Sequence, residues 1–249
     1  MISDAEITSM KRELAPLIGL RIDWLSLPET ALSGFEPSQI AVIINTLADA
    51  VLPQIELLAE TEENREKLQR LGLSKAPSQI GNRESYPDYI HRSGYRLELK
   101  GLFVDTPSLG LKRPPTRREP SARLKENVKL SNIIPDKDFL MLAAIQLQRF
   151  STVCKPVIID IGLFPMDHCI EARDRRLIAS GGRWREGIPQ VVKKTSQTKY
   201  RRGEVLSDSD YQKDTNFGKL KRIPYEPLQR FMLRHGIVAS LDEEQLDLE

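Results

Sequence analysis

The chain has 249 residues, enough to bury one sizeable core, and its content of 40% hydrophobic and 29% charged residues is ordinary for a globular protein. No stretch approaches the roughly 20 apolar residues that a membrane-spanning helix requires. The acidic N-terminus, Met1 to Glu6, lacks the basic and apolar regions of a signal peptide. The two cysteines and three histidines show no zinc-site spacing. We therefore expect no membrane partner, a cytoplasmic location and reduced thiols.

The net charge of +2 conceals an uneven distribution along the chain. Residues 112–129 contain seven basic and two acidic residues, and residues 183–202 contain seven basic and one acidic residue. Residues 1–80 and 203–249 instead carry an acidic excess. Basic segments in the middle of the chain indicate a polyanionic partner, although a charged segment is more often simply a solvated surface.

Three helices are predicted in residues 1–80. Residues 4–18 have an amphipathic pattern, apolar residues recur at spacings of three and four in residues 37–58, and a charged helix is predicted at residues 62–71. Ser3 or Asp4 is available as the N-cap of the first helix. Pro53 is expected to kink the second.

The pattern then changes to that of strands. A short strand is predicted at residues 86–90, and residues 95–104 alternate apolar and polar side chains. Ser93-Gly94 between them is typical of a turn. Continuous apolar runs at residues 139–147 and 157–164 indicate strands that are buried on both faces.

Helices are predicted again at residues 167–178 and 225–236, separated by a polar, loop-rich segment. The order of helices, strands and helices predicts an α/β or α+β fold with a mixed central sheet flanked by helices. We expect one compact domain with three regions. These are an N-terminal helical region at 1–80, a catalytic sheet core at 81–182, and DNA-contacting loops with a C-terminal helix at 183–249.

The candidate catalytic residues are Asp88, Glu98 and Lys100. Pro87-Asp88 is followed, after nine intervening residues, by Glu98-Leu99-Lys100. Side chains two apart on a strand project from the same face, so Glu98 and Lys100 point together, and Asp88 can approach Glu98 across the hairpin. Two converging carboxylates make a site of hard oxygen ligands suited to Mg²⁺. Lys100 could orient or deprotonate the attacking water, or stabilise the phosphate.

The motif is short, and its context decides how specific it is. Composition predicts roughly two acid-x-Lys triplets by chance, whereas the chain has one, shortly after one of its two Pro-Asp dipeptides. The other dipeptide, Pro135-Asp136, has no such triplet downstream. The competing interpretation is that Glu98 and Lys100, with Arg96, form the solvent-exposed face of a strand. The pattern alone leaves both interpretations open.

The segment from Tyr86 to Val104, with the apolar strands that follow it, resembles the PD-(D/E)xK nuclease superfamily, and within it the type II restriction endonucleases. The resemblance covers roughly residues 84–165, and its specific part is the three-residue motif. It implies a restriction-endonuclease-like fold and a Mg²⁺-dependent enzyme that hydrolyses phosphodiester bonds of double-stranded DNA. Such enzymes usually act as homodimers on a short, often palindromic site, in a prokaryotic cytoplasm.

By the same resemblance, Asp88 and Glu98 are the metal ligands and Lys100 is the catalytic lysine. Many members of the superfamily add a further acid from an N-terminal helix. The candidates for that acid, among which the sequence does not choose, are Glu56, Glu60 and Glu84.

Two basic segments are expected to contact DNA, since they combine cations with hydrogen-bonding side chains or with prolines that limit loop entropy. The residues are Lys112, Arg113, Arg117 and Arg118 in the first, and Lys193, Lys194, Lys199, Arg201 and Arg202 in the second.

Two other classes of function fit the same residues. One is a nuclease of this superfamily with another task, such as a repair nickase, a junction resolvase or a phage exonuclease. The other is a non-catalytic DNA-binding protein whose carboxylates are incidental. Metal-dependent cleavage of plasmid DNA separates the second class from the enzymes, and discrete bands favour a restriction enzyme.

Overall fold

A computed structural model describes most of the chain. The described residues are 3–23, 25–51, 62–76, 86–113, 122–179, 183–185, 188–190 and 217–237. The chain divides into two compact units, unit 1 with residues 1–113 and 135–165, and unit 2 with residues 114–134 and 166–249. These units are defined by spatial contacts, whereas the three regions predicted from the sequence are defined by function. The three regions stay a prediction.

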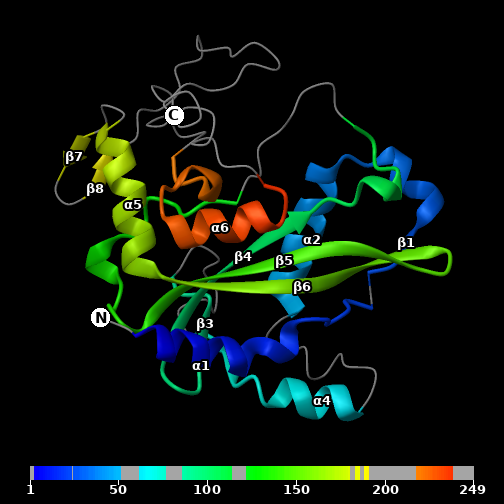
Figure 1. Cartoon of the computed structure of the whole chain (residues 1–249), viewed down its shortest axis with the longest axis horizontal. Coiled ribbons are helices and arrows are strands. Elements are labelled where there is room, and N and C mark those ends of the chain that lie inside the picture. The colour runs from blue at the N-terminus through cyan, green and yellow to red at the C-terminus, as the bar shows by residue number, and fades with distance from the viewer. Residues whose placement is uncertain are drawn as a thin grey trace, which may run out of the picture. The chain divides into compact units, whose positions relative to one another are not determined.

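Unit 1 contains a six-stranded sheet in the order β1-β6-β5-β4-β3-β2. The strands are β1 (Leu27–Pro28), β2 (Leu73–Lys75), β3 (Tyr89–His91), β4 (Arg96–Val104), β5 (Asp138–Phe150) and β6 (Val153–Pro165). β4 and β5 run parallel, and every other neighbouring pair is antiparallel. β5 and β6 form the long two-stranded ribbon that is labelled in Figure 1. The predicted α+β class with a mixed sheet is confirmed.

The four predicted strands are present, with bounds that differ from the sequence patterns. β5 and β6 extend beyond their apolar runs because a two-residue turn, with Ser151 at a φ of 57°, joins them into one antiparallel hairpin. The polar residues near that turn therefore also pair. β1 and β2 were not predicted, since two or three residues are too few to show alternation.

The described residues of unit 1 include the helices α1 (Asp4–Leu14), α2 (Pro37–Val51) and α4 (Glu62–Gln69). Ser3 caps α1 in a capping box with Glu6, so the predicted cap is confirmed. α1 ends earlier than predicted because Pro16 cannot donate a helical hydrogen bond, and Ala15–Leu17 forms a 3₁₀ turn instead. Pro53 lies outside the described residues, so its kink stays a prediction.

One face of the sheet carries the main core of unit 1. Leu97 and Leu99 of β4 pack there with Ile40 and Ile44 of α2. α2 lies against β4 (Figure 1). A Cβ atom at Gly101 of β4 would lie 1.8 Å from the side-chain oxygen of Asn45, so glycine permits this close approach. Glu98 and Lys100 alternate with these residues and project from the opposite face.

Unit 2 contains helices α5 (Met166–Ala179) and α6 (Glu226–Arg234), which confirm the two predicted C-terminal helices. It also contains a hairpin that was not predicted, formed by β7 (Arg183–Arg185) and β8 (Ile188–Gln190). An isolated antiparallel bridge joins Arg123 to Lys219.

Two further findings concern membrane-spanning helices and the two cysteines. Across the described ranges, no helix combines the length and apolar character needed to cross a membrane. Cys154 in β6 and Cys169 in α5 are buried free thiols, and burial raises the pKa of each. Because the thiolate is the reactive form, neither side chain is suited to nucleophilic chemistry.

Candidate functional site

Asp88 lies directly before β3 and faces β4. Its backbone N–H donates to the carbonyl oxygen of Leu97 at 3.0 Å, and its Oδ2 accepts a hydrogen bond from the N–H of Leu99 at 2.8 Å. The antiparallel register pairs Tyr89 with Leu97, so continuing it by one residue sets Asp88 opposite Glu98. Directly opposite residues have Cβ atoms about 4.5–5.5 Å apart on one face of a sheet. The two acids of the motif are thus cross-strand neighbours.

Glu98 and Lys100 form an ion pair on that face, with 2.6 Å between Nζ and Oε1. The Glu98 side chain is only 10% exposed and that of Lys100 25%. A carboxylate with so little access to water needs a charged partner, which Lys100 provides. The low exposure of Glu98 also disagrees with the interpretation of these residues as a solvent-exposed strand face.

Three residues to which the sequence assigned no functional role border the motif on the same face. Asp138, the first residue of β5, is 3% exposed, and the parallel register pairs it with Arg96. Its Oδ1 lies 3.0 Å from Nε of Arg96, and its Oδ2 accepts a hydrogen bond of 2.5 Å from the hydroxyl of Tyr86. The Arg96 guanidinium also lies over the Tyr86 ring, 5.2 Å from its centroid.

Burial and the hydrogen bond to Asp138 raise the pKa of Tyr86 well above its usual value. The hydroxyl therefore remains protonated and acts as a donor throughout the physiological pH range. A donor of this kind and a buried carboxylate form a charge-assisted hydrogen bond, which is stronger than a neutral one. The polar cluster next to the motif is consequently held in a fixed arrangement.

The donor set fits a magnesium ion that shares its coordination with a substrate. Within the described part of the chain, no group of three or more His, Cys, Asp or Glu side chains is arranged to hold a metal. Mg²⁺ is commonly bound through one or two carboxylates, with waters and phosphate oxygens as further ligands, and Asp88 and Glu98 supply that number. The three candidates for an additional acid, Glu56, Glu60 and Glu84, lie outside the described residues.

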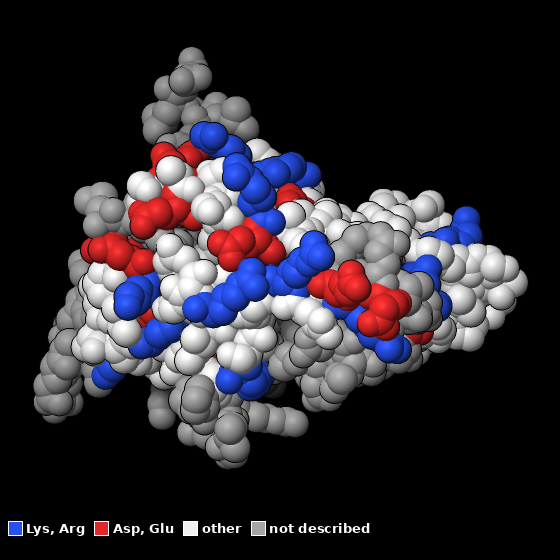
Figure 2. All heavy atoms as spheres, turned by 90° about the horizontal axis from the view of Figure 1, so that it is seen from below, with Lys and Arg blue, Asp and Glu red and all other residues white. Residues whose placement is uncertain are grey.

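Most of the predicted DNA-contacting residues also lie outside the described residues, and only Lys112 and Arg113 are described. Both are exposed, and Arg113 forms an ion pair with Asp105. The residues for which nothing is described are Arg117, Arg118, Lys193, Lys194, Lys199, Arg201 and Arg202. On the face shown in Figure 2, Lys and Arg are interspersed with Asp and Glu. That face has no uniformly basic surface, and the DNA-contacting role of both segments stays a prediction.

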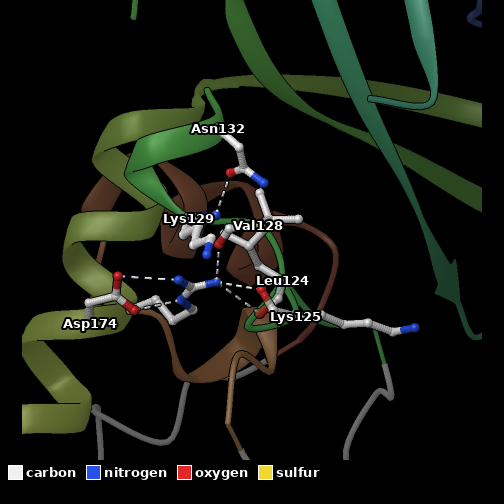
Figure 3. A network of polar contacts seen from close by, with 7 residues as sticks. Leu124, Lys125, Val128, Lys129, Asn132 and Asp174 are labelled. Carbon is white, nitrogen blue, oxygen red and sulfur yellow. Dashed lines mark hydrogen bonds and ion pairs between the residues drawn. The ribbon is translucent and has the colours of Figure 1, made fainter. Parts of the chain in front are cut away.

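Unit 2 contains a second buried polar network, around Arg173 of α5 (Figure 3). Its guanidinium is 0% exposed and donates to both carboxylate oxygens of Asp174, at 2.7 and 3.2 Å. It also donates to the carbonyl oxygens of Lys125 at 2.6 Å and Val128 at 2.8 Å. Each of its three nitrogens has a protein acceptor, so this arginine secures residues 122–134 against α5 and has a structural role.

Comparison of the chain with protein-family models, with curated proteins and with solved structures returned no match. The functional assignment therefore depends on the geometry of Asp88, Glu98 and Lys100 and on their chemistry.

Proposed function

We propose that this protein is a sequence-specific, Mg²⁺-dependent endonuclease that hydrolyses phosphodiester bonds of double-stranded DNA, a type II restriction enzyme of the PD-(D/E)xK superfamily. One observation carries the proposal. Asp88 and Glu98 are cross-strand neighbours on one sheet face, and Nζ of Lys100 lies 2.6 Å from Glu98 on that face. The mixed sheet that carries them agrees with a restriction-endonuclease-like fold.

In this proposal, Asp88 and Glu98 bind the cation. Both are preorganised, Asp88 by the N–H of Leu99 and Glu98 by Lys100. Mg²⁺ would supply positive charge against the phosphate and assist activation of water. A carboxylate pair without a cation would repel the phosphate, so the metal is required for substrate binding at this point as well as for chemistry.

Lys100 is the residue that would contact the reacting groups directly. In the ion pair with Glu98 its ammonium group is a hydrogen-bond donor. A donor in this place is suited to orienting the attacking water or to binding a phosphate oxygen. It is less suited to deprotonating the water. Such a fixed positive charge also offsets the negative charge that develops on the phosphate during hydrolysis.

A homodimer is part of the proposal because a two-fold assembly presents one active site to each strand of a palindromic target. Sedimentation of the DNA complex is expected to give a mass equal to the duplex plus about twice the chain mass of 28.3 kDa. A single chain on the DNA would instead favour a nickase or sequential cutting of the strands.

The decisive experiment compares the two Pro-Asp dipeptides of the chain. Asp88→Asn keeps the size of the side chain but removes a charge that a hard cation requires, so cleavage in millimolar Mg²⁺ should fall by more than about 100-fold. Asp136→Asn is the matched control, since Asp136 is exposed and its φ of 67° is one that asparagine also tolerates. It should cut at the wild-type rate.

Lys100→Ala and Ca²⁺ complete the test. Lys100→Ala should abolish cleavage yet keep metal-dependent DNA binding, because both carboxylates remain. Ca²⁺ binds oxygen ligands with looser geometry than Mg²⁺ and should support binding with little cutting. Cleavage by folded Asp88→Asn at the wild-type rate would exclude this site. DNA binding by the wild type without cleavage would favour a non-catalytic protein, and nicks or smears would favour another nuclease of the superfamily.

A further inference from the structure

We propose that Tyr86, Arg96 and Asp138 form a polar strap that positions Asp88 for cation binding, an inference that rests on the proposed function. The three residues belong to the segment before β3, to β4 and to β5. None of them is a cation ligand in the proposed site. They are positioning residues, which act on the metal through the backbone of residues 86–88.

The strap crosses three strands. β3, β4 and β5 are consecutive in the sheet, and neighbouring strands lie about 4.8 Å apart. Tyr86 precedes β3, yet its hydroxyl reaches Asp138 on β5 at 2.5 Å, so its side chain passes over β4. Arg96 of β4 fills the space beneath, with its guanidinium 5.2 Å from the ring centroid and its Nε 3.0 Å from Asp138.

The anchor of the strap on β5 is strong. The Asp138 side chain is 0% exposed. Its Oδ2 accepts the hydrogen bond from Tyr86, and its Oδ1 lies in an ion pair with Arg96. Loss of either partner would leave the buried carboxylate incompletely paired, at a cost in free energy. This cost favours the arrangement in which Tyr86 and Arg96 both contact Asp138. The position of the Tyr86 side chain is therefore fixed relative to β4 and β5.

A short and stiff piece of chain joins Tyr86 to Asp88. Pro87 is the only residue between them, and its ring fixes one of the backbone torsions. Asp88 is then held on its other side by Leu97 and Leu99 of β4. Groups that orient metal ligands typically change metal affinity or activity 10–100-fold when they are removed. Loss of the strap should thus weaken cation binding while the ligands themselves remain.

Tyr86→Phe tests the strap because it removes the hydroxyl and keeps the ring over Arg96. Tyr95→Phe is the matched control, since Tyr95 lies in the same hairpin but packs against Phe139 in the core on the opposite face. In Tyr86→Phe the Mg²⁺ concentration for half-maximal cleavage should rise by about 10–100-fold. The cleavage rate at saturating Mg²⁺ should recover to within about threefold of wild type, because the catalytic residues are unchanged.

A second measurement does not depend on cleavage. The N–H of Leu99 is protected by the Asp88 carboxylate, and its hydrogen exchange, followed by NMR without metal, should accelerate by about tenfold or more in Tyr86→Phe and stay unchanged in Tyr95→Phe. Asp138→Asn, which keeps an acceptor but loses its charge, should shift both measurements in the same direction. Thermal melting checks that each variant is folded.

The outcomes separate the two proposals. Wild-type Leu99 exchange in folded Tyr86→Phe would overturn the strap, whether or not the protein cuts DNA. A lower cleavage rate with an unchanged half-maximal Mg²⁺ concentration would also overturn it, since the strap acts on cation binding. If the wild type fails to cut DNA in Mg²⁺ while Leu99 exchange responds to Tyr86→Phe, the proposed function fails and the positioning of Asp88 stands.

Discussion

The backbone N–H of Leu99 donates a hydrogen bond of 2.8 Å to the carboxylate of Asp88. Leu99 is the residue between the second acid and the lysine of the motif, so this bond joins the two halves of the motif directly. In the proposed site, a carboxylate that is held by a backbone donor needs little reorganisation to bind a cation. The motif is consequently built as one unit, which makes its separate residues sensitive to changes in their neighbours.

The basic segment at residues 112–129 is predicted to contact the phosphate backbone of DNA. Each phosphate contact that is lost reduces the slope of log affinity against log salt by roughly 0.9. Replacing Arg117 and Arg118 with alanine should therefore reduce the magnitude of the slope by roughly two. Fluorescence anisotropy of labelled duplex in Ca²⁺ measures the slope. The control is the double variant Lys11→Ala, Arg12→Ala, which removes two exposed charges from α1. A salt slope equal to that of the wild type in the Arg117 and Arg118 variant would exclude the contact.

Removal of Arg173 should strongly destabilise the protein. Arg173→Met leaves Asp174 buried without its cation, which typically costs about 3–5 kcal/mol. Arg230→Met is the control, since Arg230 forms an exposed pair with Glu226 and should cost less than about 1 kcal/mol. Denaturant unfolding of both variants measures the difference. Equal losses would mean that the buried network contributes no more than a surface ion pair.

The stability lost in Arg173→Met should depend on pH. Burial raises the pKa of Asp174, and Arg173 opposes that rise. In Arg173→Met the pKa should increase further, so the folded state binds a proton at higher pH than the unfolded state. The loss of stability should then be largest at neutral pH and smaller in acid, where Asp174 is neutral in both states.

Gly218 is expected to tolerate substitution less well than Gly236. Both have positive φ, 69° and 73°, so alanine costs about 1–2 kcal/mol of backbone strain at either position. At Gly218 the added Cβ would also lie 1.9 Å from the carbonyl oxygen of Leu124, whereas nothing lies within 4 Å at Gly236. Gly218→Ala should therefore lose roughly 1–3 kcal/mol more than Gly236→Ala in chemical denaturation. Similar losses would show that the loop moves to accommodate the methyl group.

His91 should make the stability of the protein fall in mild acid. Burial lowers the pKa of His91 below its usual value, although Glu13, 3.4 Å away, opposes this effect. As pH falls through about 6.5, the unfolded chain binds a proton at this histidine before the folded chain does, so folding becomes less favourable. Urea unfolding between about pH 8 and pH 5 measures the slope, which His91→Gln should flatten. Glu13→Gln should steepen it, and a shallower slope there would contradict this assignment.

The strand that carries the motif shows how far the sequence could predict the site. Alternation in residues 95–104 predicted β4, and the spacing of Glu98 and Lys100 predicted that they share a face. The pattern left open whether that face was exposed to solvent, because alternation does not reveal what covers each side of the strand. β4 lies between β3 and β5, and Glu98 is largely buried. The tertiary arrangement, and not the local pattern, determines that burial.

The polar strap could not be predicted for a different reason. Tyr86 and Asp138 are 52 residues apart, and a side-chain contact between distant segments leaves no periodic signal. The one local hint was an acid at the start of an apolar run, which is also common in exposed strand ends. Arg173 and Asp174 are similarly inconspicuous, since consecutive helical residues point about 100° apart and do not usually pair.

The parallel pairing of β4 with β5 has a consequence for synthesis of the chain. During translation β3 and β4 emerge well before β5, because residues 105–137 separate the two parallel strands. Until then, β4 is an unprotected edge strand, prone to pair with other chains. The β5–β6 hairpin, closed by a two-residue turn, forms in microseconds once it is made, and its docking covers that edge. Docking of β5 thus brings Asp138 beside Arg96 and covers the exposed edge of β4 in the same step.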